Sequence, residues 1–307
     1  MKSYLACLGL SARIVSSVGG LEHIPSTRRW NFTRERFRRS FSPFFCRKGA
    51  QLKAEHFKQC LFVDLGIMTV PDMERLMTSA VRLRTDNKIP DLLFFSAHPK
   101  TVALGLRGGN AEQPKDLLVP VERLQEEGIA LTRSVRGGGI TFHWPGQVVC
   151  YPVMLLGPGE RDIPGFMNKL EEVGIRTFSR FGLNVTRKRD SSSHVGLWRG
   201  NEKVASMGIR VSKWVTSFGF VINVEGNHTE SAYVRPCGLE GVVLATMEEI
   251  LGHAPPREMV IETVKESFGV VFNRILKPMP AKLLDMIRLI HASSEAPFGR
   301  LGGRNDR

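Results

Sequence analysis

The sequence predicts an α/β (α+β) fold in which helices pack on a mixed β-sheet. Apolar runs typical of strands and amphipathic segments typical of helices follow one another without strict alternation, which favours a mixed sheet. Of the 307 residues, 42% are hydrophobic and 24% are charged, a composition typical of a globular domain. Because no run of about 18 apolar residues occurs, we expect no membrane span.

Helices are expected where apolar residues recur at helical spacing. In 164–182, Phe166, Leu170, Val173 and Phe178 are spaced for one face, and in 71–87 a proline stands in the first turn. Two further helices are expected at 121–128 and 260–275. Strands are expected at 60–66, 91–99, 129–135, 146–156, 202–211 and 215–224. We expect residues 281–307 to form a C-terminal helix and a disordered tail, the tail beginning near Glu295.

The first fifty residues are strongly basic. They carry ten Lys or Arg and two acids, Glu22 and Glu35, which leaves +8 of the chain's net charge of +13. Arg-rich, Ser-rich and acid-poor composition is typical of an organelle transit peptide. We therefore expect residues 1–55 to be a disordered mitochondrial transit segment, with a plastid-type organelle as the alternative. A basic arm that binds nucleic acid is the other interpretation.

The five cysteines, Cys7, Cys46, Cys60, Cys150 and Cys237, show no C-x-x-C spacing, so neither a disulfide framework nor a zinc cluster is expected. Cys237 stands in "RPCGLEG", between Pro236 and Gly238, two residues that shape backbone. A thiol in that setting is either presented as a nucleophile or packed as a small apolar side chain.

Two other stretches are candidates for chemistry. "SVRGGGITFHWPGQ" (134–147) has three glycines after Arg136, with neither the Gly-Lys-Ser/Thr of a P-loop nor a dinucleotide fingerprint. It is either a ligand cradle, in which glycine backbone N–H groups face the ligand, or a hairpin turn. In "NEKVASMGIRV", Lys203 opens a run of small and apolar residues. It is either suited to proton transfer by partial desolvation or a solvated lysine at a strand edge.

Taken in order, four motifs resemble the lipoyl(octanoyl) transferase family: R-G-G-x-x-T-F-H-x-P-G-Q (136–147), K-V-x-S-x-G-I-R (203–210), G-x-x-x-N (219–223) and P-C-G-L (236–239). The resemblance covers about residues 60–275. "GLRGG" (105–109) and "VTSFGF" suggest its mitochondrial branch. It implies a catalytic domain of the biotin/lipoate protein ligase type over 56–280.

The resemblance also implies a function. Cys237 would take an octanoyl group from octanoyl-acyl carrier protein and pass it to a lysine of a lipoyl domain, with Lys203 as the cysteine's partner. Acceptors would be the lipoyl domains of 2-oxoacid dehydrogenase E2 subunits and the glycine cleavage H protein. The implied enzyme needs no cofactor and no metal, and we expect a monomer. Substrate-binding residues would be Arg136, Gly137, Gly138, Gly139, Ile140, Thr141, Phe142, His143, Ser206, Met207, Gly208, Gly219, Phe220 and Val221.

The chain departs from the family pattern at two positions of note. Trp144 stands where the family commonly has glycine, and Phe218 where it commonly has histidine. Three alternatives are kept: an ATP-dependent lipoate or octanoate ligase, a cysteine thioesterase or amidase, and a non-enzymatic basic protein that binds nucleic acid. The last is weakened because most of the excess charge lies in the expected transit segment.

Overall fold

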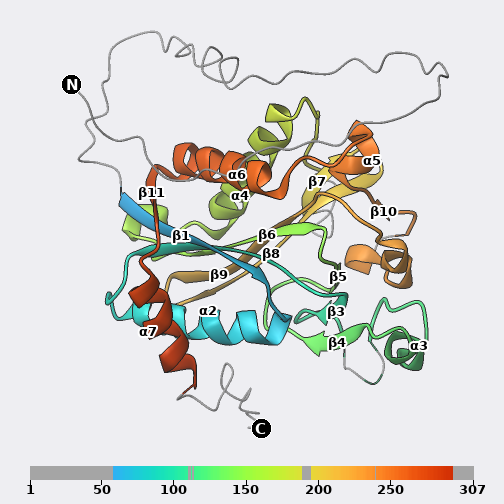
Figure 1. The fold of residues 1–307 in the computed structure, drawn as a ribbon, viewed down its shortest axis with the longest axis horizontal. Helices are drawn as coiled ribbons and strands as arrows, with labels where there is room; N and C mark the ends of the chain where they lie inside the picture. Colours follow the sequence, from blue (N-terminus) through green and yellow to red (C-terminus); the bar gives the residue numbers. More distant parts are fainter. Residues whose placement is uncertain (1–57, 110–111, 113, 189–194, 239, 293–307) are drawn as a thin grey trace, which may run out of the picture. The chain divides into compact units, whose positions relative to one another are not determined.

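A mixed sheet of eight strands forms the centre of the protein (Figure 1). The computed structural model describes residues 58–109, 112, 114–188, 195–238 and 240–292, all within the unit Lys53–Arg307. The strand order is β10-β8-β9-β6-β2-β1-β11, and β7 pairs with β8. The pairs β1–β11, β1–β2 and β8–β10 are parallel. The pairs β2–β6, β6–β9, β8–β9 and β7–β8 are antiparallel.

The bounds of the sheet strands are β1 Lys58–Ile67, β2 Asp91–Ala97, β6 Gln147–Val153, β7 Gly196–Arg199, β8 Glu202–Ser212, β9 Val215–Asn223, β10 Val243–Leu244 and β11 Arg274–Pro278. Every residue of β2, β6 and β9 is buried, because helices cover both faces at these strands.

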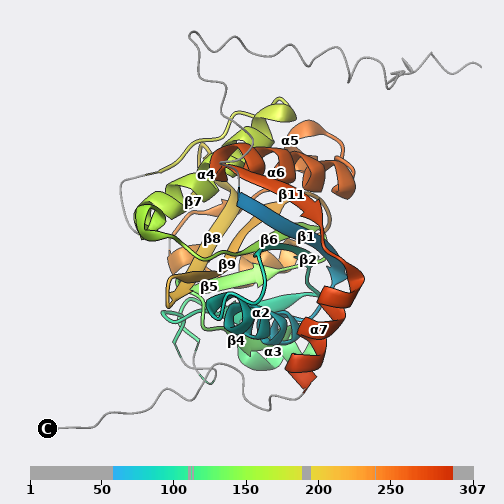
Figure 2. The same cartoon turned by 90° about the vertical axis from the view of Figure 1, so that its left-hand side faces the viewer.

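Two helical layers sandwich this sheet (Figures 1 and 2). Helices α4 (Ile163–Arg180), α5 (Met247–Leu251) and α6 (Arg257–Phe272) contribute to the core on one face. Helices α2 (Val70–Thr85) and α7 (Ala281–Ala292) contribute to the core on the other. Asp162 caps the start of α4, where its side chain accepts a hydrogen bond from the N–H of Gly165.

A smaller sheet stands beside the large one. It has the order β4-β3-β5, with β3 at Thr101–Leu104, β4 at Ala130–Arg133 and β5 at Ile140–His143. Helix α3 (Val121–Glu126) and three short 3₁₀ turns, η2 (Pro158–Glu160), η3 (Thr229–Tyr233) and η4 (Pro236–Gly238), complete the described elements. A third hydrophobic core, beside the two that flank the large sheet, packs residues of the small sheet and α3 against Trp144, Val234 and Leu244. The small sheet thereby contacts the loop that carries Cys237.

The expected fold class and the positions of most elements are confirmed. One expected helix is too long: α6 ends at Phe272, and Asn273 adopts a left-handed backbone with φ 54°. The chain then turns into β11, so Arg274 and Ile275 are strand residues. The sequence prediction missed the short strands β3, β5, β7, β10 and β11 and the short helix α5. The transit segment 1–55 and the tail from Glu295 lie outside the described residues.

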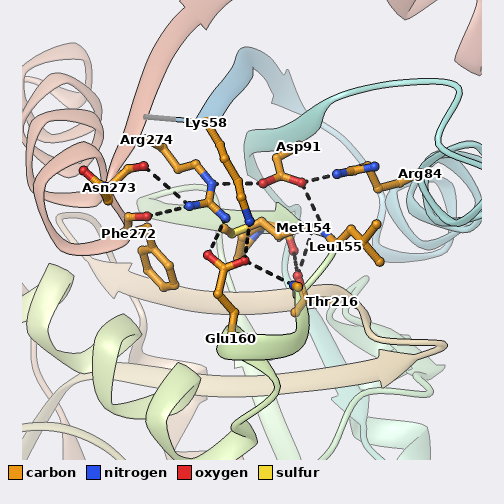
Figure 3. Close-up of polar contacts among 12 residues, drawn as sticks. Lys58, Arg84, Asp91, Met154, Leu155, Glu160, Thr216, Phe272, Asn273 and Arg274 are labelled. Atoms are coloured by element: carbon orange, nitrogen blue, oxygen red, sulfur yellow. Dashed lines mark hydrogen bonds and ion pairs between the residues drawn. The ribbon is translucent and has the colours of Figure 1, made fainter. Parts of the chain in front are cut away.

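A group of charges, buried at Asp91 and Arg274, links β11 to the rest of the sheet (Figure 3). Arg274 Nε donates to Asp91 Oδ2 at 3.0 Å, and both side chains are 2% exposed. Arg84 Nε donates to Asp91 Oδ1 at 2.9 Å, and Arg274 Nη2 donates to Glu160 Oε1 at 2.9 Å. Lys58 Nζ donates to Glu160 Oε2 at 2.7 Å. The group connects β1, β2, β11, α2 and η2.

This arrangement predicts an acid-sensitive contribution to stability from Glu160. Burial alone would raise the pKa of Glu160, but hydrogen bonds from Lys58 and Arg274 outweigh it and lower the pKa from 4.5 to about 2. A lowered pKa stabilises the fold above pH 4.5, and this contribution disappears as the pH falls to about 2. Glu160→Gln should therefore be less stable than the wild type in urea unfolding at pH 7, and the gap should close between pH 4.5 and 2.

The matched control is Glu122→Gln, at an exposed glutamate of α3. It should follow the wild type at every pH. A gap between Glu160→Gln and the wild type that stays constant down to the acid limit would contradict the assignment.

Candidate active site

Lys203 lies in β8 at the centre of a three-strand array. It is 1% exposed, and it pairs with Trp198 of β7 on one side and Leu244 of β10 on the other. Its Nζ lies 5.2 Å from the centre of the Trp198 ring. Its carbonyl oxygen accepts hydrogen bonds from Ala245 N at 3.1 Å and Asn223 Nδ2 at 3.2 Å. Lys203 is thus a buried strand lysine, and the alternative of a solvated lysine at a strand edge is wrong.

Cys237 is the middle residue of the short turn η4, which lies against β5. The turn is fixed by backbone contacts on both sides. Gly238 has φ 71° and its N–H donates to Arg235 O at 3.0 Å, and the N–H of Arg235 donates to Asp116 O at 2.8 Å. A residue with a Cβ at position 238 would be strained by that φ and would lie 3.1 Å from Asp116 Oδ2. Glycine is therefore required immediately after the cysteine.

Two adjoining pockets run along β8 and β9 from this turn. The Pro236 pocket is lined by Ile140, Thr141, Phe142, Gln147, Ser206, Val221, Asn223, Val234, Pro236 and Leu244. The Phe218 pocket is lined by Val70, Glu74, Ala103, Ser134, Arg136, Thr141, His143, Val149, Tyr151, Ser206, Met207, Gly208, Phe218, Gly219, Phe220 and Val221. The two pockets adjoin at Thr141, Ser206 and Val221, which line both, and the pair is called the channel here.

The channel gathers most of the predicted binding residues. Nine of them line the Phe218 pocket, which holds about 490 Å³ of space free of atoms, part of it open to solvent: Arg136, Thr141, His143, Ser206, Met207, Gly208, Gly219, Phe220 and Val221. Ile140 and Phe142 line the Pro236 pocket. Pro236, next to Cys237, lies there together with Leu244, the partner of Lys203 in β10. A neighbour of Cys237 in sequence and a neighbour of Lys203 in the sheet thus line the same pocket.

The glycines of the predicted ligand cradle, Gly137 to Gly139, make backbone hydrogen bonds to other segments of the chain. The N–H of Gly137 donates to Ile209 O at 3.0 Å, so it does not face a ligand as expected. The carbonyls of Gly138 and Gly139 accept from Arg107 N and Gly105 N, each at 3.0 Å. A Cβ on Gly105 would lie 2.5 Å from Gly138 O. The two glycine-rich segments thus dock on each other and hold Arg136 beside the Phe218 pocket.

A chain of buried polar groups leads from the pocket wall to Lys203. His143 Nδ1 pairs with Gln147 Oε1 at 2.9 Å, Gln147 Nε2 donates to Asn223 Oδ1 at 3.0 Å, and Asn223 Nδ2 donates to the Lys203 carbonyl. Burial, together with the neighbouring His98, lowers the pKa of His143 well below its usual value. His143 is therefore neutral at pH 7, and its place in this chain is to hold Gln147.

A second histidine, His98, lies behind the pocket wall, with its ring centre 5.1 Å from that of His143. His98 Nε2 pairs with the Tyr151 hydroxyl at 2.6 Å, and Nδ1 with Met68 O at 2.7 Å. Burial lowers the pKa of His98 as well. The sequence prediction did not select Tyr151 or His98, which lie in expected strands, or Glu74, which lies in the expected helix 71–87. Gln147 and Asn223 are the last residues of the motifs 136–147 and 219–223, and their place in these motifs is the sequence feature that could have identified them.

Trp144, at a position where the family commonly has glycine, braces the segment before Cys237. Its Nε1 donates to Glu225 O at 2.8 Å, and its ring centre lies 5.0 Å from that of His228. Two residues further along, the carbonyl of Gly146 accepts hydrogen bonds from the N–H groups of Val224 and Glu225. Trp144 is 1% exposed. The Trp144 side chain therefore fills a buried space, and it lines neither pocket of the channel.

Over the described ranges, no group of three His, Cys, Asp or Glu side chains could hold a metal ion. Across these same ranges, none of the helices has the length and apolar character that a membrane span requires.

The fold is that of lipoate ligase catalytic domains. A structure of lipoate-protein ligase A bound with ATP superposes with a TM-score of 0.59 at 16% identity, covering 77% of this chain and 95% of that one. The bipartite lipoate protein ligase of Thermoplasma acidophilum gives a TM-score of 0.58 at 14% identity over 77% of this chain and 92% of that chain.

Sequence comparison gives the family. The family model for the lipoyl protein ligase A/B catalytic domain matches residues 73–269. Octanoyltransferases of Caldicellulosiruptor bescii and Desulforamulus reducens are 36% and 34% identical over 67% and 69% of this chain, and over 89% and 91% of their own lengths. The chain belongs to the lipoyl protein ligase A/B catalytic-domain family, within its lipoyl(octanoyl) transferase group, and is an acyltransferase.

Proposed function

We propose that this protein transfers an octanoyl group from octanoyl-acyl carrier protein, through a thioester on Cys237, to the ε-amine of a lysine on a lipoyl domain. The observation that carries the proposal is the pair of adjoining pockets. One is lined by Pro236 of the Cys237 turn and by Leu244, the strand partner of Lys203, and the other is lined by residues of β8, β9 and α2. A channel of this form suits a linear acyl chain attached at the turn. The octanoyltransferase relatives support the acyl group chosen.

The chemistry needs only two side chains. The Lys203 ammonium stabilises the Cys237 thiolate, which attacks the donor's thioester carbon; a new C–S bond forms, the carrier's C–S bond breaks, and Lys203 gives a proton to the leaving thiolate. The amine of the acceptor lysine then attacks the octanoyl-enzyme and loses a proton to the neutral Lys203, and the Cys237 thiolate leaves. One amide is made and the enzyme returns to its starting charge state. Sulfur replaces sulfur in the first step, so that step is close to balanced in free energy.

The buried position of Lys203 supports this role. An ammonium held away from solvent stabilises a nearby thiolate more strongly than an exposed one, because the local dielectric constant is lower. Gln147 and Asn223 fix the Lys203 backbone, and Gly238 and Asp116 fix the Cys237 turn. Lys203 and the Cys237 turn are thus held by separate supports.

The test is the mass of the intact protein after exposure to octanoyl-acyl carrier protein without acceptor. We expect the mass to increase by one octanoyl group on Cys237, and the increase to disappear when a lipoyl domain is added. Cys237→Ser should form no octanoyl-enzyme, and its transfer rate should fall by more than about 10³-fold, because a serine hydroxyl is far harder to ionise than a thiol. Cys150→Ser is the control at a buried cysteine of β6 and should still be acylated.

Transfer by Cys237→Ser near the wild-type rate, or an octanoyl group on another residue, would overturn the assignment of the nucleophile. Activity with free octanoate and ATP would favour the ligase alternative instead.

We also propose that the protein acts in mitochondria, on the lipoyl domains of 2-oxoacid dehydrogenase E2 subunits and on the glycine cleavage H protein. The basic, acid-poor composition of residues 1–55 supports the location. A fluorescent reporter fused to residues 1–55 should accumulate in mitochondria. The same reporter with the arginines of residues 28–39 replaced by glutamine should not. Diffuse cytosolic signal from the unchanged fusion would contradict the proposal, and plastid signal would favour the alternative organelle.

A further inference from the structure

Phe218 has an unusual backbone for a bulky residue in a strand. Its φ is 58°, in the left-handed region that large side chains rarely adopt. Along β9, Phe220 and Ile222 belong to the core under α4 and α6, whereas Val215 and Val221 belong to the core under α2. Regular alternation would place Phe218 on the side of Phe220. The left-handed turn places it instead in the core on the α2 face.

That turn brings the ring to the Phe218 pocket. Phe218 is 3% exposed, and its ring centre lies 6.5 Å from that of Tyr151 in an edge-to-face arrangement. Val70 and Glu74, one turn apart on α2, line the same pocket. Backbone outliers of this kind persist only where the surroundings hold them, and they cluster at functional sites.

Glu74 adds a polar group to this wall. It is 8% exposed, and among the described residues its Oε1 is buried without a hydrogen-bond partner. Burial raises the pKa of Glu74, against the opposing effects of Ser134, Arg136 and Arg210. A hydrocarbon chain that reached this carboxyl would remove its remaining polar surroundings and offer no hydrogen bond in return, which is unfavourable.

Both residues belong to the pocket that does not include the neighbours of Cys237. Pro236, Asn223 and Leu244 line only the Pro236 pocket, whereas Phe218 and Glu74 line only the Phe218 pocket. From Asn223 to Phe218 is five residues of β9, about 16 Å at roughly 3.3 Å per residue. The pocket that holds Phe218 therefore lies well along β9 from the residues beside the Cys237 turn.

We propose that Phe218 and Glu74 form the end wall of the acyl channel and set the upper limit on the length of the acyl chain. Phe218 blocks a longer chain sterically, and Glu74 makes the remaining space unfavourable for hydrocarbon. The inference rests on the proposed function, since it assigns the channel to the acyl chain.

The test compares kcat/KM for octanoyl-, decanoyl- and dodecanoyl-acyl carrier protein in the wild type, Phe218→Ala and Glu74→Leu. In Phe218→Ala we expect the preference for octanoyl over the longer chains to fall by about fourfold for each further methylene that enters the pocket. Glu74→Leu replaces the carboxyl with an apolar group of similar size and should shift the preference the same way, with little loss of stability. Glu122→Gln on α3 is the control and should keep the wild-type ratios.

The outcomes of these measurements distinguish the chain-length inference from the proposed function. Unchanged chain-length ratios in Glu74→Leu and in a folded Phe218→Ala would overturn the inference while leaving the proposed function intact. If Phe218→Ala does not fold, Glu74→Leu alone decides. A wild type that forms no acyl-enzyme with any of the three donors contradicts the proposed function itself, which is a different outcome.

Discussion

Lys203→Met should slow formation of the octanoyl-enzyme by about 10²–10⁴-fold, the usual contribution of a group that stabilises a nucleophile and transfers its proton. Methionine has a similar length and suits the buried position, so the fold should be retained. The loss should appear in both half-reactions, because the same side chain gives a proton in the first and takes one in the second. The measurement is single-turnover acylation followed by intact mass, with thermal unfolding as the check on folding.

The chain offers a matched control at Lys188. Its Nζ lies 4.4 Å from the centre of the Trp198 ring, the same ring that Lys203 Nζ approaches at 5.2 Å, yet Lys188 is partly exposed. Lys188→Met should leave acylation within about twofold of the wild type, as expected for a partly exposed charge. Equal rate losses in the two variants would show that the loss comes from the Trp198 contact and not from the chemistry of Lys203.

Arg274→Met should lower the free energy of unfolding by about 3–5 kcal/mol, because it leaves the buried carboxylate of Asp91 with one partner fewer. Arg274 and Asp91 are each 2% exposed, and Arg274 also donates to Glu160 and to the Phe272 carbonyl (Figure 3). The measurement is chemical denaturation at pH 7. The change should be thermodynamic alone, and the folded fraction of the variant should still form the octanoyl-enzyme.

Two further variants separate this effect from the loss of a surface charge. Arg288→Met removes an arginine of α7 whose ion pair with Asp285 is exposed, and it should change stability by less than about 1 kcal/mol. The double variant Arg274→Met with Asp91→Leu should recover part of the loss, because no uncompensated carboxylate is then left at position 91. A double variant as unstable as the sum of its single changes would indicate that packing, not charge, explains the effect.

The sequence predicted the long, regular elements well. Helices α2 and α4 have clear apolar faces and proline in the first turn, and β6, β8 and β9 are continuous runs of strand-forming residues. It failed where an element is short or where one residue changes the backbone. After α6 the apolar spacing continues through Ile275, and only Asn273, in a left-handed conformation, marks the helix end. Four-residue strands such as β3 and β7 offer too few residues for a periodic pattern.

The sequence motifs predicted most residues that line the channel, but not the roles of Glu74 and Phe218. Arg136, Ser206 and Gly219 stood in quoted motifs and line the Phe218 pocket. Glu74 lies in an amphipathic helix and carries a charge, which is typical of a surface residue; in the structure it is buried and lines a pocket with Ser134 and Arg136 from elsewhere in the chain. The left-handed turn at Phe218 could not be foreseen, since a glycine or asparagine would normally signal it.

The parallel pairing of β1 with β11 has a consequence for how the protein is made. One side of β1 pairs with β2, which follows soon after it, but the other side pairs with residues 274–278, more than two hundred positions later. Until the ribosome has released that last segment, β1 presents an open row of backbone donors and acceptors, which is a template for aggregation. Newly made chains should therefore depend on chaperones until residues 274–278 have been made and have paired with β1. A protein fused behind position 292 should prolong that exposure little. A premature stop before position 274 should leave the edge of β1 permanently open.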